Sequence, residues 1–233
     1  MESNPCHDIE EVKNYSNYTV LARSITVQKN LIIDDYVGVR FDVVERELNK
    51  ALGLLGIFPL WWSTTAAMKD APVLQKMVEP FLGGDDPIFG YRTSLTLDDF
   101  FDGNKLGAMR PDSGAQMNII AGIGASMAGW DGLLVYIDIP NNEIQFRARA
   151  GSIANIGTRA ADDPKKMYKR FYFVDWIVLN RYKKAILPSI DVIVDGQREE
   201  DITWAEGTDI RAGLNSLAHN AFRVRPWFEP GAW

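Results

Sequence analysis

Five aspartates gather in one stretch of the sequence, at Asp85, Asp86, Asp98, Asp99 and Asp102, with aromatic residues among them. Carboxylate oxygens are the ligands that hard cations such as Mg²⁺ prefer. The cluster, with Asp98 and Asp99 at its centre, is therefore a candidate site for magnesium or for hydroxyl groups of a ligand. The same residues have a structural interpretation, because aspartates favour the first turn of a helix and tight turns. We favour the structural interpretation.

A glycine-rich turn, GIGAS, follows the apolar run MNIIA and contains Gly122 and Gly124. A strand that ends in such a turn is a common place for a phosphate in α/β proteins. The chain has no GxxxxGK[ST] sequence, and Met127 stands where GxGxxG needs its last glycine. Because two glycines in a turn often serve only to let the backbone bend, we interpret GIGAS as a packing turn.

Charged residues follow the next apolar run, which ends at Asp138. Arg147 and Arg149 lie on the helix predicted after it. Two arginines two positions apart do not share a helical face, so they need different partners. One could bind a phosphate and the other a carboxylate, or both could be solvated.

The sequence offers few residues for a disulfide, a zinc site or a serine nucleophile. With one cysteine and two histidines, the chain can form no internal disulfide and no typical zinc site. No serine sits in a GxSxG sequence. We therefore predict no catalytic residue, no metal ligand and no cofactor in this chain. The net charge of −6 argues against nucleic acid as a partner, and the lack of a signal sequence or a long apolar run predicts a cytoplasmic protein outside the membrane.

Strands and helices are expected to alternate along most of the chain. The predicted strands cover 18–27, 57–63, 117–124, 132–140, 168–174 and 190–196, and the predicted helices cover 41–56, 71–82, 94–109, 141–151, 175–187 and 209–220. This pattern predicts a three-layer α/β fold with a mostly parallel sheet. We expect a flexible leader over 1–16, the α/β domain over 17–222, and the start of a linker or following domain over 223–233.

The order of features over 94–151 resembles the middle of uridine-kinase-like P-loop kinases. The segments that carry the resemblance are DDFFDGNKLGAM, MNIIAGIGAS, LLVYIDIP and NEIQFRARAG. It implies a P-loop-kinase-like core without a Walker A motif, in which Gly122, Asp138, Arg147 and Arg149 fall on the ligand-binding positions. Since the Walker lysine is absent, it implies a kinase site that has decayed.

A second resemblance covers residues 81–233 and rests on FLGGDDPIFG, LTLDDFFD, YKRFYFVDW, DVIVDGQ and RVRPWFEPGAW. Together these look like the N-terminal region of long bacterial mannose-6-phosphate isomerase-like proteins, where a kinase-like domain precedes a cupin domain. The resemblance implies a cupin partner, in the same polypeptide or separate, and places zinc only in that cupin.

The sequence therefore predicts a non-catalytic accessory domain of a sugar-phosphate isomerase-like protein, which binds a nucleotide or sugar phosphate or only packs against the cupin. One alternative is a small-molecule kinase with an atypical phosphate loop, using Asp98, Asp99 or Asp138 near magnesium and an arginine lid. The other is an interaction module without a ligand.

Overall fold

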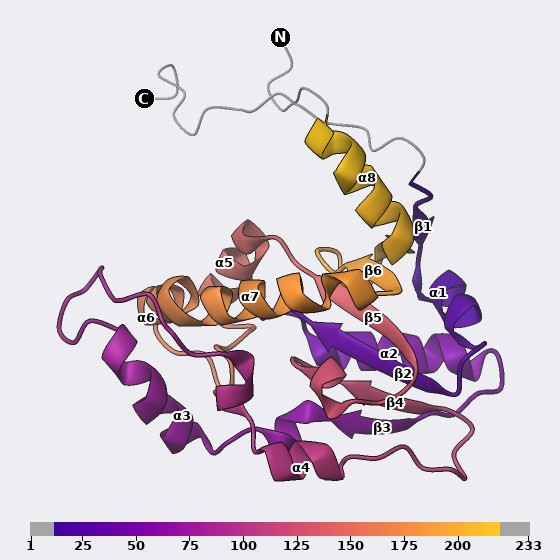
Figure 1. Ribbon diagram of the computed structural model, residues 1–233, viewed down its shortest axis with the longest axis horizontal. Coiled ribbons are helices and arrows are strands. Elements are labelled where there is room, and N and C mark those ends of the chain that lie inside the picture. The colour runs from indigo at the N-terminus through magenta and orange to yellow at the C-terminus, as the bar shows by residue number, and fades with distance from the viewer. Residues whose placement is uncertain (1–11, 220–233) are drawn as a thin grey trace.

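A seven-stranded sheet forms the centre of the protein, whose computed structural model describes residues 12–219 (Figure 1). Its strand order is β1-β7-β6-β5-β2-β4-β3. The pairs among β3, β4, β2, β5 and β6 are parallel, whereas β7 runs antiparallel to both β6 and β1. The strands are β1 (Tyr15–Ser16), β2 (Asn30–Asp35), β3 (Leu60–Ser63), β4 (Asn118–Ala121), β5 (Leu133–Asp138), β6 (Val192–Asp195) and β7 (Thr203–Glu206).

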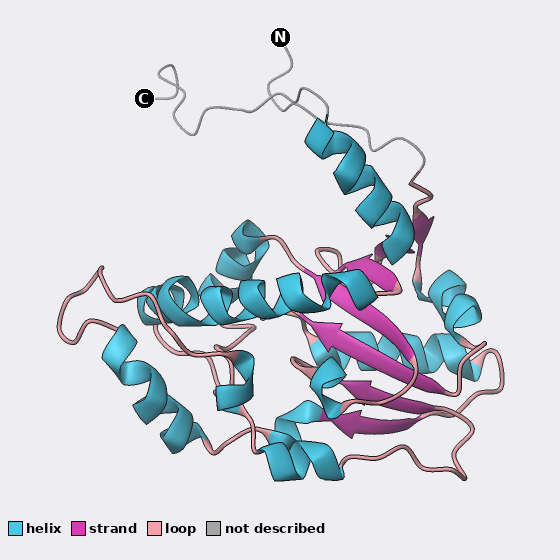
Figure 2. Ribbon diagram, viewed as in Figure 1, coloured by secondary structure: helices cyan, strands magenta, loops and turns pink. Residues whose placement is uncertain are grey.

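Helices cover both faces of this sheet (Figure 2). The first two helices pack on one face, and α3 to α7 contribute to the core on the other face. The predicted three-layer α/β fold with a mostly parallel sheet is confirmed. The helices are α1 (Tyr18–Ile25), α2 (Phe41–Gly53), α3 (Ala71–Val78), α4 (Gly103–Ala108), α5 (Asn141–Arg149), α6 (Pro164–Arg170), α7 (Trp176–Ile186) and α8 (Gly207–His219).

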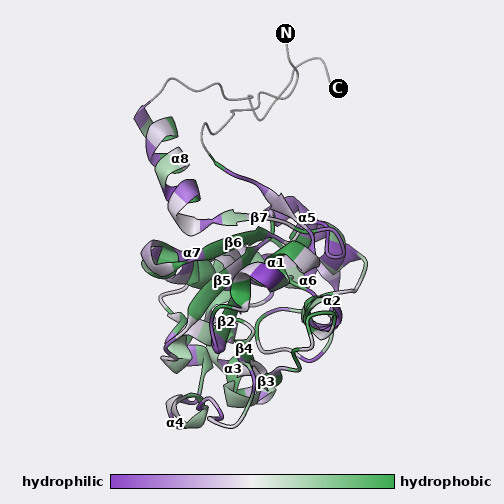
Figure 3. Cartoon of the chain, turned by 90° about the vertical axis from the view of Figure 1, so that its right-hand side faces the viewer, coloured by the Kyte–Doolittle hydropathy of each residue, from purple (hydrophilic) through white to green (hydrophobic). Residues whose placement is uncertain are grey.

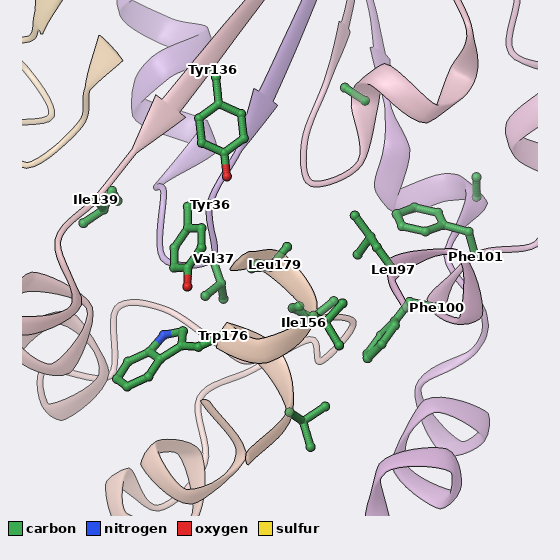
Figure 4. Close-up of a cluster of buried hydrophobic side chains, with 14 of the residues drawn as sticks. Tyr36, Val37, Leu97, Phe100, Phe101, Tyr136, Ile139, Ile156, Trp176 and Leu179 are labelled. Atoms are coloured by element: carbon green, nitrogen blue, oxygen red, sulfur yellow. The ribbon is translucent and has the colours of Figure 1, made fainter. Parts of the chain in front are cut away.

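The central strands are apolar on both faces because each face is covered by helices. Ile32, Ile120 and Tyr136 point to the core beneath α7, while Ile33 and Ile119 point to the core beneath α1 and α2. Figure 3 shows these strands as the most hydrophobic part of the chain. Figure 4 shows part of the core beneath α7. The two cores share one sheet, so the position of each strand is fixed from both sides.

The strand predicted over 18–27 is wrong, because Tyr18–Ile25 form helix α1. Its buried residues, Tyr18, Leu21, Ala22 and Ile25, recur at helical spacing and face α2 and the sheet. The Asn17 side chain accepts a hydrogen bond from the Val20 N–H at 3.0 Å and so caps the helix. The β-branched residues suggested a strand, but the amphipathic spacing and the cap decide the local structure.

The strand predicted over 168–174 is also wrong. Helix α6, a π-helical stretch at Phe171–Asp175 and helix α7 follow one another without a break. The run of aromatic residues suggested a strand, but in the structure it forms helical turns that pack on the sheet. Three strands were missed, β1, β2 and β7. The end of β2 was hidden by Asp34 and Asp35, residues that strands seldom contain.

The other predicted elements are present, with shorter bounds in most cases. The segment 57–63 yields β3, but as the partly exposed edge strand and not as a buried one. Of the predicted leader, residues 1–11 lie outside the described part, and Tyr15–Ser16 pair with β7. The segment 223–233 also lies outside it. Among residues 12–219, no helix is both long and apolar enough to cross a bilayer.

Candidate functional site

The GIGAS turn follows β4, and its backbone requires glycine. Gly122 has a φ of +113° and Gly124 a φ of +76°, and a Cβ on Gly122 would lie 2.5 Å from the hydroxyl oxygen of Thr64. The N–H of Gly124 donates to one carboxylate oxygen of Asp34 at 3.0 Å, and the N–H of Ser126 donates to the other at 2.9 Å. The amides that could have cradled a phosphate thus hold an internal carboxylate, which supports the interpretation as a packing turn.

Asp34 is fully buried in this network. The Tyr182 hydroxyl also donates to its carboxylate, and the Ser126 hydroxyl lies 2.7 Å from the Tyr182 oxygen. Burial raises the pKa of Asp34 to about 6, against hydrogen bonds that lower it. Every bond around Asp34 comes from a donor, so the ionised carboxylate is the form that fits at neutral pH.

Asp138 lies at the carboxyl end of β5 and is half-buried. Its carboxylate forms an ion pair with Lys183, with Nζ 2.9 Å from the nearer oxygen. The same ammonium group lies 4.9 Å from the centre of the Tyr36 ring, and the Tyr36 hydroxyl donates to Asn180. These residues line an open hollow of about 500 Å³. Asp138 therefore lies at the carboxyl end of a central strand, in a hollow that Asp98, Asp99 and Arg149 do not line.

Arg147 is buried and bonded by the protein on every side. Its guanidinium donates to Glu143 at 2.9 Å and pairs with Glu199 at 2.8 Å. The backbone carbonyls of Gly38, Gly196 and Gln197 accept its remaining bonds. This arrangement joins α5 to two loops and leaves little capacity for a ligand, so we do not carry Arg147 into the proposed site.

Arg149 is exposed and faces a different region, a mainly apolar groove beside α6. The prediction that the two arginines would not share a helical face is confirmed.

The aspartates of the 85–102 segment act as caps and turn residues. The Thr96 N–H donates to Asp99 at 2.8 Å in a capping box, and Asp102 caps α4 by accepting from the N–H groups of Asn104 and Lys105. Within residues 12–219, no three acidic, histidine or cysteine side chains come together as a metal site. Asp98 and Asp99 as ligand contacts stay a prediction. The bonds of Asp99 match the structural interpretation, as does the position of Asp98 in the first turn of its helix.

A larger cavity, of about 740 Å³, opens beyond the carboxyl ends of β2, β3 and β4. The chain segments around it are the β2–α2 loop, the segment after β3, the start of the GIGAS turn at Gly122, and the 152–159 loop. In open α/β sheets, ligands bind in the crevice outside the carboxyl ends of the strands. This cavity also contains the position that follows a parallel strand and precedes a helix, where a P-loop would lie. We take it as the candidate site.

Asp35 is the buried polar residue that distinguishes this cavity. It is the last residue of β2, its exposed fraction is 4%, and it lines the cavity. Its Oδ1 atom has no hydrogen-bond partner within the protein. Burial, with a contribution from the charge of Asp34, raises the pKa of Asp35 well above its usual value. Leaving a buried acceptor unpaired costs on the order of 1–3 kcal/mol, so the residue is a candidate for contact with a ligand.

The amino end of α2 faces the same cavity. Arg40 and Phe41, where the helix begins, line it, and no side chain caps the helix. Free N–H groups and the helix dipole favour an anion at such an end. Four cationic residues line the cavity, namely Arg40, Lys69, Lys105 and Arg159, together with Asp42 and Asp70.

Two of those cations are engaged elsewhere. Lys69 donates to the carbonyl of Asp99 at 2.8 Å, and Arg40 pairs with Glu199 at 3.2 Å. The side chains of Lys105 and Arg159 are exposed and have no hydrogen bond or ion pair within the described part of the chain. They are therefore available to a ligand.

The wall formed by the 152–159 loop is fixed by a buried polar network. Asn155 donates to Asp175 at 2.7 Å, and the N–H of Ile156 donates to the same carboxylate. Arg170 pairs with Asp175 at 3.4 Å and donates to the carbonyl of Ile156. Because α7 and the π-helical stretch hold Asp175, they position this wall of the cavity.

Of the residues predicted to bind a ligand, Gly122 lies at this cavity. Sequence reasoning did not single out Asp35, Lys105 or Arg159. The available signal for Asp35 was the pair of aspartates directly after the apolar run LII. An aspartate there must lie at the carboxyl end of a buried strand, if the run is a strand. Lys105 and Arg159 carry no comparable signal, because isolated basic residues in loops and short helices are usually solvated.

The sequence model of a protein family described as a domain of unknown function, DUF8485, matches residues 17–219. The chain belongs to this family. Comparison with curated proteins found no match. Among solved structures, the DUF8485 chain is similar to a candidate fructose transport system kinase from Silicibacter sp. TM1040, with 12% sequence identity and a TM-score of 0.47. The similarity covers 72% of this chain and 94% of the other.

Proposed function

We propose that the DUF8485 domain binds a small phosphorylated molecule, a sugar phosphate or a nucleotide, in the cavity beyond β2, β3 and β4. The observation that carries the proposal is the buried carboxyl group of Asp35, which lines the cavity with an unpaired oxygen. A ligand hydroxyl group would supply the missing partner.

The phosphate would lie at the amino end of α2. The uncapped helix offers N–H groups, and Lys105 on α4 and Arg159 in the 152–159 loop offer positive charge from two other segments that line the cavity. The volume of about 740 Å³ lies within the range of roughly 300–1,000 Å³ that is usual for small-molecule sites.

The proposal is for binding without phosphoryl transfer. The β2–α2 loop carries no GxxxxGK[ST] sequence, and the amides of the GIGAS turn are bonded to Asp34. Phosphoryl transfer depends on positioned positive charge around the phosphates. The β2–α2 loop has no lysine for this role, and its one arginine, Arg40, pairs with Glu199. An accessory role beside mannose-6-phosphate isomerase chemistry, with a cupin partner that holds zinc, stays a prediction, because the family match says nothing of an isomerase.

The test is calorimetric titration of the purified chain with fructose 6-phosphate, mannose 6-phosphate and Mg·ATP. We expect saturable one-to-one binding of at least one of them, weakened tenfold or more by Lys105→Glu. Lys184→Glu, which changes the same charge on an exposed position outside the cavity, serves as the matched control. A flat titration at millimolar concentrations of all three ligands would contradict the proposal. It would favour the alternative interpretation of the chain as an interaction module without a ligand.

Asp35→Asn separates function from stability. We expect this variant to bind tenfold more weakly while its unfolding midpoint is no lower than that of the wild type, because the carboxyl group is not bonded within the protein. A large loss of stability would show instead that Asp35 serves the fold. Sustained ATP consumption in the presence of a sugar would overturn binding without transfer and establish the kinase alternative.

A further inference from the structure

A second groove, of about 720 Å³, lies between the 83–92 loop and the helices α5 and α6. In Figure 1 this loop follows α3 and approaches α6 at the far end of the molecule from β1. The residues that line the groove are distinct from those that line the cavity at the strand ends. It therefore needs an explanation of its own.

The walls of this groove are large apolar side chains that solvent reaches. Ile88 and Phe89 are 67% and 68% exposed, and Tyr172 is 55% exposed. Tyr168 and Phe173 complete the walls. A soluble domain seldom exposes several large apolar side chains in one place unless they contact something.

The loop that presents Ile88 and Phe89 is fixed in place. The Asp86 carboxylate accepts hydrogen bonds from the N–H groups of both residues, each at 2.8 Å. The N–H of Tyr91 donates to the carbonyl of Phe81 at 2.8 Å, which closes the loop, and Lys169 donates to the carbonyl of Asp86. The exposure is therefore built into the structure, and a ligand would not have to order the loop on binding.

The opposite wall contains the π-helical stretch Phe171–Asp175. A π turn is rare and is frequently found at functional sites. Here the carbonyl of Phe173 accepts a hydrogen bond from the N–H of Thr93 at 3.0 Å, so the distortion ties the helix to the far end of the loop. It also places Phe171, Tyr172 and Phe173 along the same groove.

The charge of the groove is opposite to that of the chain. Arg149, Lys165 and Lys169 line it, and none of the described residues that line it is acidic, although the chain carries a net charge of −6. Lys169 is bonded to the loop, whereas Arg149 is exposed at the rim. Basic residues around an apolar groove select a ligand that is apolar in its body and negatively charged at one end.

We propose that this groove is a binding site for small amphiphilic anions, molecules with an aromatic or aliphatic body and one carboxylate, sulfonate or phosphate group. The aromatic walls hold the body, and Arg149 and Lys165 hold the acidic group. This proposal stands independently of the cavity at the strand ends.

The test measures binding of the anionic fluorophore 8-anilinonaphthalene-1-sulfonate to the folded full chain. Decanoate and decylammonium then compete with the fluorophore, each below its critical micelle concentration. We expect saturable one-to-one binding, which decanoate displaces at least tenfold more effectively than decylammonium of the same chain length. The double variant Arg149→Glu/Lys165→Glu is expected to weaken binding tenfold or more, with Lys29→Glu/Lys184→Glu as the matched control. Phe89→Ser, or Ile88→Ser if that variant misfolds, is expected to do the same.

Equal displacement by decanoate and decylammonium would overturn the proposal, as would binding that survives the double variant. A concentration-dependent dimer that Phe89→Ser abolishes and decanoate leaves intact would assign the groove to self-association instead. Loss of fluorophore binding in Lys105→Glu but not in Phe89→Ser would also contradict it, because that result would place the fluorophore in the other cavity.

Discussion

Two adjacent aspartates at the end of β2 show how far the surroundings of a residue decide its role. Asp34 points to one face of the sheet and accepts hydrogen bonds from the GIGAS turn and Tyr182. Asp35 points to the other face and keeps an oxygen without a partner at the edge of a cavity. Neighbouring residues of a strand alternate between faces, so one carboxyl group serves the fold and the other is free for a ligand.

The titration of Asp34 makes a measurable contribution to the pH dependence of stability. Its pKa is about 6 in the folded protein and near 3.8 when unfolded, so folding favours the protonated form. The contribution is fully present below about pH 4 and is lost as the pH rises through 6. Between pH 4.5 and 7, Asp34→Asn is expected to remove about 2 kcal/mol of the wild-type decrease in the free energy of unfolding, at about 1.4 kcal/mol per pKa unit. Urea unfolding of the wild type and of Asp34→Asn at both pH values checks this. If the free energy of unfolding fell as much in the variant as in the wild type, the prediction would be contradicted.

Arg147 and Arg149 provide a matched pair for testing buried against exposed charge. Arg147→Ala leaves Glu143 and Glu199 without their buried partner and is expected to cost about 3–5 kcal/mol of unfolding free energy. Arg149→Ala, two residues away on the same helix, is expected to stay within about 0.5 kcal/mol. The midpoints of urea unfolding of the two variants test this. Similar losses of unfolding free energy in both variants would refute the structural role assigned to Arg147.

At the scale of elements, capping residues account for the acidic cluster. Asp99 accepts hydrogen bonds from the N–H and the hydroxyl of Thr96, and Asp102 caps α4, while Asp98 lies in the first turn. Each cap satisfies N–H groups that the start of a helix leaves free. The cluster therefore reflects three local features of the backbone and not one shared site.

Asp99→Ala is expected to cost about 1 kcal/mol of unfolding free energy through loss of the capping box, and Asp98→Ala less than about 0.5 kcal/mol. Neither loss should depend on magnesium, since the bonds of Asp99 are internal. Thermal unfolding with and without 10 mM of the chelator EDTA tests both points. A magnesium-dependent midpoint that Asp98→Ala abolishes would restore the metal interpretation.

The element that sequence patterns described least well is the long helical segment from α6 to α7. Its aromatic residues are those that strands favour, yet the segment is helical, and Phe171 and Trp176 are buried in the core on that face of the sheet. Buried packing outweighs intrinsic preference, which spans only about 1 kcal/mol per residue. The π-helical stretch ends at Asp175, which accepts a hydrogen bond from Asn155 and so fixes one wall of the cavity.

At the scale of the whole molecule, the two cores are coupled through shared strands. Neighbouring residues of β2, β4 and β5 belong to opposite cores, so neither core can open without disturbing the other. We expect tryptophan fluorescence and far-ultraviolet circular dichroism to report one unfolding transition with the same midpoint. Trp62 and Trp130 sample one face and Trp61 and Trp204 the other. Two separated transitions would contradict this coupling.

The sequence by itself determined the α/β class and most of the elements that follow an obvious pattern. The apolar runs gave β4, β5 and β6, and the spaced apolar residues gave α2, α3 and α8, because local periodicity reflects which side of an element is buried. The turn interpretation of GIGAS also followed from local residues, since glycine is needed wherever φ is positive.

Only the tertiary structure decided which of the polar residues could meet a ligand. The predicted residues Asp98, Asp138, Arg147 and Arg149 lie in separate regions, whereas the candidate cavity draws Asp35, Lys105 and Arg159 from segments far apart in the chain. Burial and hydrogen bonding depend on those distant segments, and no local pattern records them. For the same reason, the sequence could not distinguish the bonded carboxyl group of Asp34 from the unpaired one of Asp35.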